Sequence, residues 1–169
     1  MSSSADLVLK NTAWRLEAIT PTDQATCPDR FQRYSPGKHP NPKAGSGVTR
    51  WFAVEWLGSK EDSGATCATM REAIHAYSIT VLYAVQSGDW EDWQVLALQD
   101  RHKIRECLRA DANPSTGVDN RKGYDDDHAT DDIGLMARRF IGDSLDKETD
   151  PKLWRLVFEV ACKIREEEV

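Results

Sequence analysis

The chain has 169 residues, of which 40% are hydrophobic and 30% are charged, and it carries a formal net charge of −6 at pH 7. This length and composition are those of one soluble domain that buries a core without disulfides or metals. The acidic balance argues against a general nucleic-acid binder, whose Lys and Arg neutralise phosphates, but it is compatible with a protein that DNA slides past.

The cysteines and the N-terminal residues indicate a cytoplasmic folding compartment. The four cysteines lie far apart and form no CxxC pair, which argues against a zinc clip or a redox motif. Cys107 and Cys162 fall on apolar stripes, so we expect them to be reduced core residues. Residues 1–6 lack the features of a signal peptide, and no apolar run is long enough for a membrane helix. We therefore expect a soluble protein with no membrane contact.

The N-terminal third predicts a helix, a short strand, a long loop and a long strand. Residues 5–20 mix apolar and polar side chains as an amphipathic helix does, and Pro21 ends that helix, although Leu7-Val8-Leu9 could also begin a strand. Residues 30–34 favour a short strand. Residues 35–47 are rich in proline and glycine and predict a long loop within the domain. Residues 48–57 are strongly β, with large apolar side chains on both faces.

The middle of the chain predicts a turn, a helix, a strand and a second helix. We expect a turn over 58–64, a helix over 65–76 and an alternating strand over 77–85. A helical stretch then runs to about Arg109, but Asp100 interrupts its apolar stripe. A shorter helix capped by Asp100 removes that conflict, and we prefer it to one long helix.

The C-terminal third predicts a long loop and two strands. Residues 111–132 form the loop, 133–141 a strand, and 142–151 the connection to the last strand. That last strand has apolar residues at every second position, which is typical of a half-buried strand: Trp154, Leu156, Phe158, Val160, Cys162 and Ile164. We expect the final two strands to pair antiparallel.

Together these elements predict an α+β fold. Residues 1–169 form a single domain, in which one mostly antiparallel sheet is packed with two or three helices. Two long loops, near 35–47 and 111–132, interrupt this framework.

A cluster of acidic residues in the second loop is the strongest candidate for chemistry. Carboxylates beside a histidine can bind a hard divalent cation or share protons, but this spacing fits no calcium loop. A charge run between turn residues usually forms a solvated loop or an interaction surface, and we favour that interpretation over a metal site. The cluster contains Asp125, Asp126, Asp127, His128, Asp131 and Asp132. We assign no catalytic residue, cofactor or metal ligand.

Six tryptophans are many for this length. Trp154 and Trp56 fit core positions, whereas Trp51 lies on the opposite face of its strand and needs a covering element or a neighbouring subunit. Exposed aromatic residues with arginine often anchor protein interfaces. The candidate interface residues are therefore Trp51, Arg138 and Arg155.

In chain order, these elements resemble the tail terminator (tail completion) proteins of long-tailed bacteriophages. The likeness rests on an N-terminal amphipathic segment followed by Arg50-Trp51-Phe52-Ala53-Val54. It continues in the alternating strand 77–83, the stretch from Asp100-Arg101-His102 onward, and the closing strand 153–158 followed by acids. It covers most of residues 48–168. The loops 35–47 and 111–132 are longer than those of a minimal member.

The resemblance implies a non-enzymatic structural protein of the virion, assembled in the host cytoplasm and placed at the tail neck. It implies a six-fold ring that caps the tail tube, with a head-completion or connector protein above it. DNA would pass through the lumen without specific binding, and acidic walls would favour passage. We place Asp125, Asp126, Asp127, Asp131 and Asp132 at that lumen. Two alternatives remain: a small metal-dependent hydrolase that uses residues 125–132, and a module that binds a host protein.

Overall fold

The structure is a computed structural model of the whole chain. It describes residues 4–19, 31–34, 50–67, 70–84, 90–109, 112–113, 118–119, 121, 133–147 and 153–167. The predicted loop 35–47 and the acidic residues of 125–132 lie outside the described residues.

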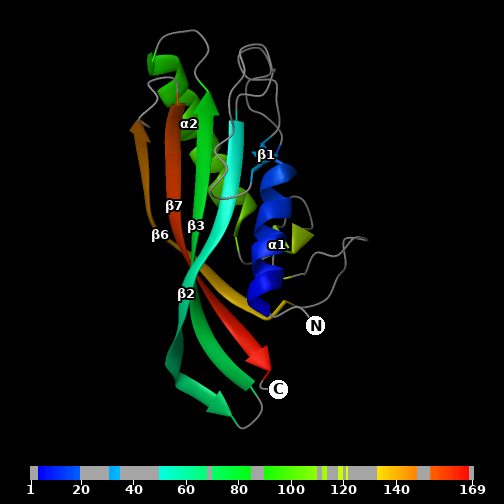
Figure 1. Ribbon diagram of the computed structural model, residues 1–169. Helices are drawn as coiled ribbons and strands as arrows, with labels where there is room; N and C mark the ends of the chain where they lie inside the picture. The colour runs from blue at the N-terminus through cyan, green and yellow to red at the C-terminus, as the bar shows by residue number, and fades with distance from the viewer. Residues whose placement is uncertain are drawn as a thin grey trace.

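The fold is α+β, as predicted, with one five-stranded sheet and two helices in the part of the chain that the structure describes. The sheet order is β1-β2-β3-β7-β6, with β1 parallel to β2 and every other pair antiparallel. Figure 1 shows long, strongly twisted strands with both helices on one side of the sheet. The elements are α1 (Ser4–Glu17), β1 (Gln32–Arg33), β2 (Arg50–Cys67), β3 (Met70–Ala84), α2 (Trp90–Cys107), β4 (Ala112–Asn113), β5 (Val118–Asp119), β6 (Leu135–Lys147) and β7 (Leu153–Glu167).

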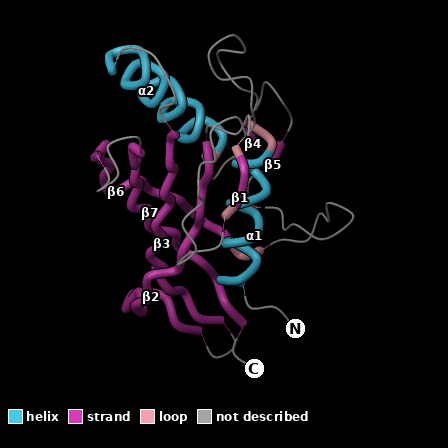
Figure 2. Tube along the Cα trace, turned by 45° about the horizontal axis from the view of Figure 1, so that its top comes forward, coloured by secondary structure: helices cyan, strands magenta, loops and turns pink. Residues whose placement is uncertain are grey.

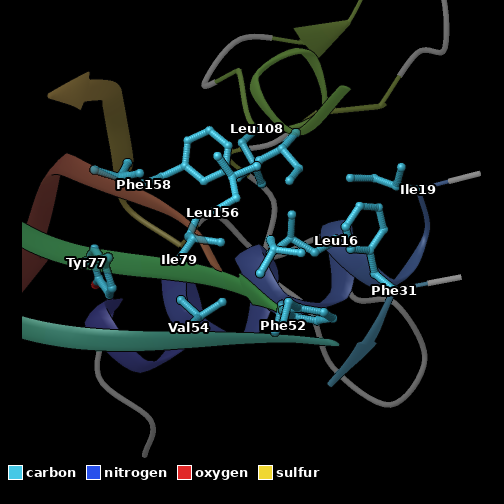
Figure 3. Close-up of a cluster of buried hydrophobic side chains, with 14 of the residues drawn as sticks. Leu16, Ile19, Phe31, Phe52, Val54, Tyr77, Ile79, Leu108, Leu156 and Phe158 are labelled. Carbon is cyan, nitrogen blue, oxygen red and sulfur yellow. The ribbon is translucent and has the colours of Figure 1, made fainter. Parts of the chain in front are cut away.

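The main core lies between the sheet and the two helices. We call the sheet face that they cover the inner face, and the opposite one the outer face. Leu16 of α1 and Leu108, which follows α2, are buried and pack in one cluster with Ile79 and Leu156 of the sheet (Figure 3). Each such side chain contributes about 1.5–3 kcal/mol when it is fully buried.

The alternation predicted for the last strand is confirmed. Trp154, Phe158 and Ile164 are at most 9% exposed, and the three apolar residues between them are buried as well. β7 lies between β3 and β6 and pairs antiparallel with both, so the predicted pairing of the last two strands is also confirmed. Cys162 is buried on this strand, and Cys107 packs against the same core, as expected.

The predicted turn at 58–64 and the predicted helix at 65–76 are wrong. β2 runs through the first segment to Cys67, and β3 begins at Met70. Gly58, with φ of 139°, directly follows the extra residue at a register shift between the strands, so a bulge stands where we expected a turn. Pairing with a long neighbouring strand supplies the hydrogen bonds that overrule the weak local helical pattern.

The prediction of a short second helix that begins at Asp100 is also wrong. α2 is a single helix over Trp90–Cys107, and Asp100 lies buried in its middle. Arg50 donates hydrogen bonds to both carboxylate oxygens of Asp100, at 2.8 and 2.9 Å. The Tyr83 hydroxyl donates to the same carboxylate at 3.0 Å. A paired carboxylate can occupy an apolar stripe, and this pairing was not visible in the local sequence.

At one end, the sheet extends beyond the helices. The strands at this end are residues 58–67 of β2, 70–76 of β3 and 161–167 of β7, which we call the arm (Figures 1 and 2); Cys162 and Ile164 at its base still belong to the main core. The other short strands, β4 and β5, pair with each other in a separate two-stranded sheet within the predicted loop 111–132.

Candidate interaction surface

The two edges of the sheet carry its most exposed apolar side chains. Trp56 and Leu57 of β2 are 52% and 59% exposed, and Ile141 of β6 is 59% exposed. The prediction that Trp56 belongs to the core is therefore wrong, whereas Trp154 is buried as predicted. Large apolar side chains at strand edges mark surfaces where another chain can pack.

Both edges have unpaired stretches within the described part of the chain. β1 pairs with β2 only at Trp51 and Phe52, and β6 is the last strand in the sheet order. The edge of β2 after Phe52 and the whole outer edge of β6 therefore present backbone N–H and C=O groups to no other described strand. Such edges can accept a strand of another chain.

Register shifts occur at the exposed apolar residues on both edges. β2 is shifted against β3 between Trp56 and Gly58, and β6 is shifted against β7 between Phe140 and Gly142. Each shift leaves one extra residue, Leu57 or Ile141, outside the regular register. Bulges bend a strand and redirect the extra side chain.

Helix α2 holds the β6 edge in place through an ionic contact on the inner face. Arg101 donates to Asp143 at 2.6 and 3.1 Å, and Arg105 donates to the same carboxylate at 2.6 Å. The hydrogen bond from Arg101 is the main cause that holds the pKa of Asp143 below its ordinary value. Charge-assisted, two-pronged contacts of this kind fix geometry as well as adding energy.

Arg138 ties the same strand to both helical segments. Its guanidinium donates to the carbonyl oxygen of Leu108 at 2.8 Å and to the Thr12 hydroxyl at 3.0 Å. Because these contacts lie on the inner face within one chain, Arg138 positions β6 against the helices.

A polar aromatic group lies where the arm joins the sheet. The Trp56 indole donates to Nδ1 of His75 at 3.2 Å, and Nε2 of His75 lies 3.3 Å from Glu166. The His75 ring is only 4% exposed and stacks near Tyr77, whose hydroxyl donates to the Ala5 carbonyl oxygen. Burial lowers the pKa of His75, and Glu166 opposes this shift.

The arm itself carries charged pairs. Lys163 contacts Asp62 at 2.9 Å and Glu72 at 2.7 Å, and Arg71 pairs with Glu61. The hydrogen bond from Lys163 is the main cause that lowers the pKa of Glu72. Exposed pairs such as these contribute little to stability. We infer that they help to keep the strands of the arm in register.

The three predicted interface residues lie in different environments. Trp51 is 8% exposed and packs on the outer face with Leu82 and Leu153, so its own chain covers most of its ring. Arg138 makes the inner-face contacts described above, and Arg155 is half-buried on β7. Trp51 and Arg155 lie in one row of the outer face, with Leu82 between them, whereas Arg138 lies on the inner face. Their role in an interface stays a prediction. The exposed residues Trp56, Leu57 and Ile141 were not identified from the sequence, because their exposure depends on which strands lie at the edges of the sheet. Leu57 and Ile141 also lie at register shifts.

The predicted lumen residues Asp125, Asp126, Asp127, Asp131 and Asp132 lie outside the described residues. Elsewhere, in the ranges that the structure describes, no group of three or more His, Cys, Asp or Glu side chains could hold a metal ion. Neither α1 nor α2 is long and apolar enough to cross a membrane.

The fold is shared with a protein of a virus-like particle. A chain in the solved structure of the virion of a native gene transfer agent (GTA) particle matches this chain with a TM-score of 0.54 and 14% sequence identity. The match covers 99% of this chain and 100% of that chain. At this identity, the likeness shows a common fold over the whole length. No protein-family model matches the chain, and no curated protein sequence matches it.

Proposed function

We propose that this protein is a structural component of a phage-like virion, a tail terminator that forms a ring, caps the tail tube and joins it to the head. The observation that carries the proposal is the fold shared over 99% of the chain with a protein of the gene transfer agent virion. The order of elements that resembles tail terminators, from the N-terminal helix to the closing strand, supports it independently.

The edges of the sheet support assembly into a ring. The exposed apolar residues Trp56 and Leu57 lie on one edge of the sheet and Ile141 lies on the other, so the two apolar surfaces face in different directions. Contacts between two different surfaces of one chain are heterologous, and they generate a closed ring when the rotation between copies closes. A closed ring also removes exposed sheet edges, which are otherwise sites of aggregation.

The proposed partners follow from the position of such a ring. One side of the ring would dock on the last ring of the tail tube and stop its growth, and the other would receive a head-completion or connector protein. DNA would pass through the centre without specific binding. The net charge of −6 suits that passage, because acidic walls repel phosphates.

Electron microscopy of the purified protein mixed with tail tubes of the same virus tests the proposal. We expect a discrete cap at one end of the tubes, and tubes that stop growing when the protein is added during assembly. A hexamer of 19.1 kDa chains has a mass of about 115 kDa. An unrelated acidic protein of similar size serves as the control. Tubes that stay uncapped and continue to grow at saturating protein would show that the proposal is wrong.

A further inference from the structure

We propose that copies of this chain join by edge-to-edge strand pairing, in which the β6 edge of one copy pairs antiparallel with the β2 edge of the next. Ile141 then packs against Trp56 and Leu57 of the neighbouring copy. The inference rests on the proposed ring and names the surfaces that build it.

The first support is the position of the exposed residues along the strand direction, which is the same on both edges of the sheet. The strand register defines transverse rows, and one row contains Trp56, Tyr77, Val160 and Phe140. Leu57 and Ile141 adjoin the two ends of this row, one on each edge. In a ring with strands along its axis, cyclic symmetry allows no shift along that axis, so the ends of one row meet in neighbouring copies. The exposed apolar residues of the two edges therefore come together.

The second support is strand direction. β2 is antiparallel to β3, β3 to β7, and β7 to β6, so β2 and β6 run in opposite directions. Rotation about an axis along the strands preserves these directions. The β6 edge of one copy and the β2 edge of the next are then antiparallel, which continues the pattern of the sheet.

The third support comes from two glycines on these edges. Glu55 and Gly142 end one row, and Gly58 and Arg139 end another. Pairing of the edges would thus place the exposed Glu55 over a glycine of the next copy, and the exposed Arg139 over another. A Cβ added at Gly142 would meet nothing within 4 Å in the single chain, and this glycine does not have a positive φ. A glycine inside a strand can mark a place where another backbone comes close.

Charge adds to this complementarity. Arg139 and Glu55 lie on the outer face, and across the proposed junction they are diagonal neighbours, within reach of long side chains. Lys60 occupies the other diagonal position of Arg139, so the two neighbours of this arginine carry opposite charges. We expect the Arg139 side chain to turn toward Glu55.

A pair of engineered cysteines, Leu57→Cys with Ile141→Cys, tests the junction on tail tubes capped by the protein. Within one chain the two positions are three strand spacings apart, about 14 Å. A disulfide requires Cα atoms about 4.4–6.8 Å apart, so a bond between positions 57 and 141 must join two copies. We expect mild oxidation of the caps to give a ladder of linked chains that ends at a closed ring. Each single-cysteine variant, and Leu98→Cys with Ile141→Cys, serve as controls, since Leu98 is exposed on α2.

The outcomes separate the junction from the function. Caps that form but give no more cross-linking than the controls would overturn the edge pairing and leave the proposed function standing. Strong dimer formation by Ile141→Cys alone would also overturn it, because that result means a symmetric β6–β6 contact. Wild-type protein that forms no caps would overturn both.

A second variant guards against a cysteine pair that fails to fold. Gly142→Leu has open space in the single chain, so we expect its melting temperature to stay within a few degrees of the wild type. Its side chain would block the approach of the next copy, and we expect at least a tenfold loss of tube capping. Normal capping by this folded variant would contradict the edge pairing.

Discussion

At the scale of single residues, a buried ion pair controls how α2 sits on the sheet. The side chains of Arg50 and Asp100 are both 0% exposed, and the Arg50 guanidinium also lies over the Phe31 ring, 4.8 Å from its centroid. Burial raises the pKa of Asp100, while the charge and hydrogen bonds of Arg50 and the Tyr83 hydroxyl oppose that shift. The pair specifies one position of the helix, because any other position would leave a buried charge unpaired.

Removal of one partner of this pair should therefore cost more than removal of both. We expect Asp100→Ala to lower the free energy of unfolding by about 3–5 kcal/mol, since it leaves the buried guanidinium without its main acceptor. The double variant Arg50→Met with Asp100→Leu should recover most of that loss. Urea unfolding of the wild type and the two variants measures the difference, and equal losses in the single and double variants would contradict the account.

His75 should make the stability of the protein depend on pH. Its pKa in the folded state is lowered from 6.5, so on acidification the unfolded state binds the proton first. The contribution of His75 to the free energy of unfolding should thus be constant above pH 6.5. It should fall as the pH drops below 6.5. Protonation also removes the Nδ1 acceptor of the Trp56 hydrogen bond.

Thermal melts between pH 7 and pH 5 measure this effect in the wild type and in His75→Asn. The amide can accept the Trp56 hydrogen bond without titrating, so the variant should lose less stability on acidification. An NMR titration of the His75 ring should give a pKa below 6.5. A pKa above 6.5 would contradict the prediction.

At the scale of elements, β7 holds the fold together, because it pairs along its length with two neighbours and contributes alternate residues to the core. Its register with β3 runs unbroken from Met70 paired with Glu167 to Ala84 paired with Leu153. Phe158 lies at its centre, 0% exposed and in an edge-to-face contact with Phe140. The strand therefore combines backbone pairing with the main apolar contacts of the inner face.

Replacement of Phe158 by Asp should leave no folded protein. The substitution removes an aromatic side chain worth about 3–5 kcal/mol and buries an unpaired carboxylate in its place. Glu159→Lys, one residue along on the exposed outer face, should change stability by no more than about 0.5 kcal/mol. Circular dichroism and thermal melts compare the two. A cooperatively melting Phe158→Asp protein would mean that the strand presents the other face to the core.

Gly134, just before β6, should not tolerate a side chain. It has φ of 72°, and a Cβ there would lie 2.3 Å from the carbonyl oxygen of Arg165. The Arg165 amide also donates to the Gly134 carbonyl at 2.8 Å. We expect Gly134→Ala to destabilise the protein by at least about 1–3 kcal/mol, because the left-handed backbone and the close contact act together. Gly142→Ala is the matched control, and chemical denaturation that finds equal effects would contradict this reasoning.

At the scale of the whole molecule, the proposed assembly depends on the parts of the sheet that the helices leave uncovered. The helices cover the inner face at one end, while the arm and the two edges remain available for contacts (Figures 1 and 2). In the proposed ring, the edges join copies, the arm is free to reach a neighbouring ring, and the acidic loop lies toward the DNA.

Reversal of charge in that loop should slow the passage of DNA. Asp125, Asp126 and Asp127 changed to Lys would attract phosphates that the wild-type loop repels, so ejection from particles carrying the variant should be several-fold slower. The effect should weaken at high salt, because salt screens exposed charges. Electron microscopy of the rings and a time course of DNA ejection separate assembly from passage. Unchanged ejection with intact rings would place the loop away from the lumen.

Local sequence patterns were enough to predict the elements whose signal lies within one segment. The alternation along β7, the alternating strand at 77–83 and the amphipathic N-terminal helix each carry their own signal, since burial on one face dictates side-chain type at a fixed period. These patterns were sufficient to predict an α+β fold with a mostly antiparallel sheet.

Tertiary structure decided the rest, because the deciding partners are far apart in the chain. The local sequence predicts a helix start at Asp100. In the structure, Arg50, fifty residues earlier in the chain, pairs with this carboxylate inside the core. The local sequence predicts a turn in the segment after Gly58. In the structure, this segment continues β2, because it pairs with β3. The sequence places Trp56 in the core, but β2 lies at an edge of the sheet beyond its pairing with β1, and Trp56 is exposed beside Leu57. Contacts between residues far apart in the chain decide which buried charges are paired, how long a strand becomes and which strand edges are exposed. A local sequence pattern carries no information about these contacts.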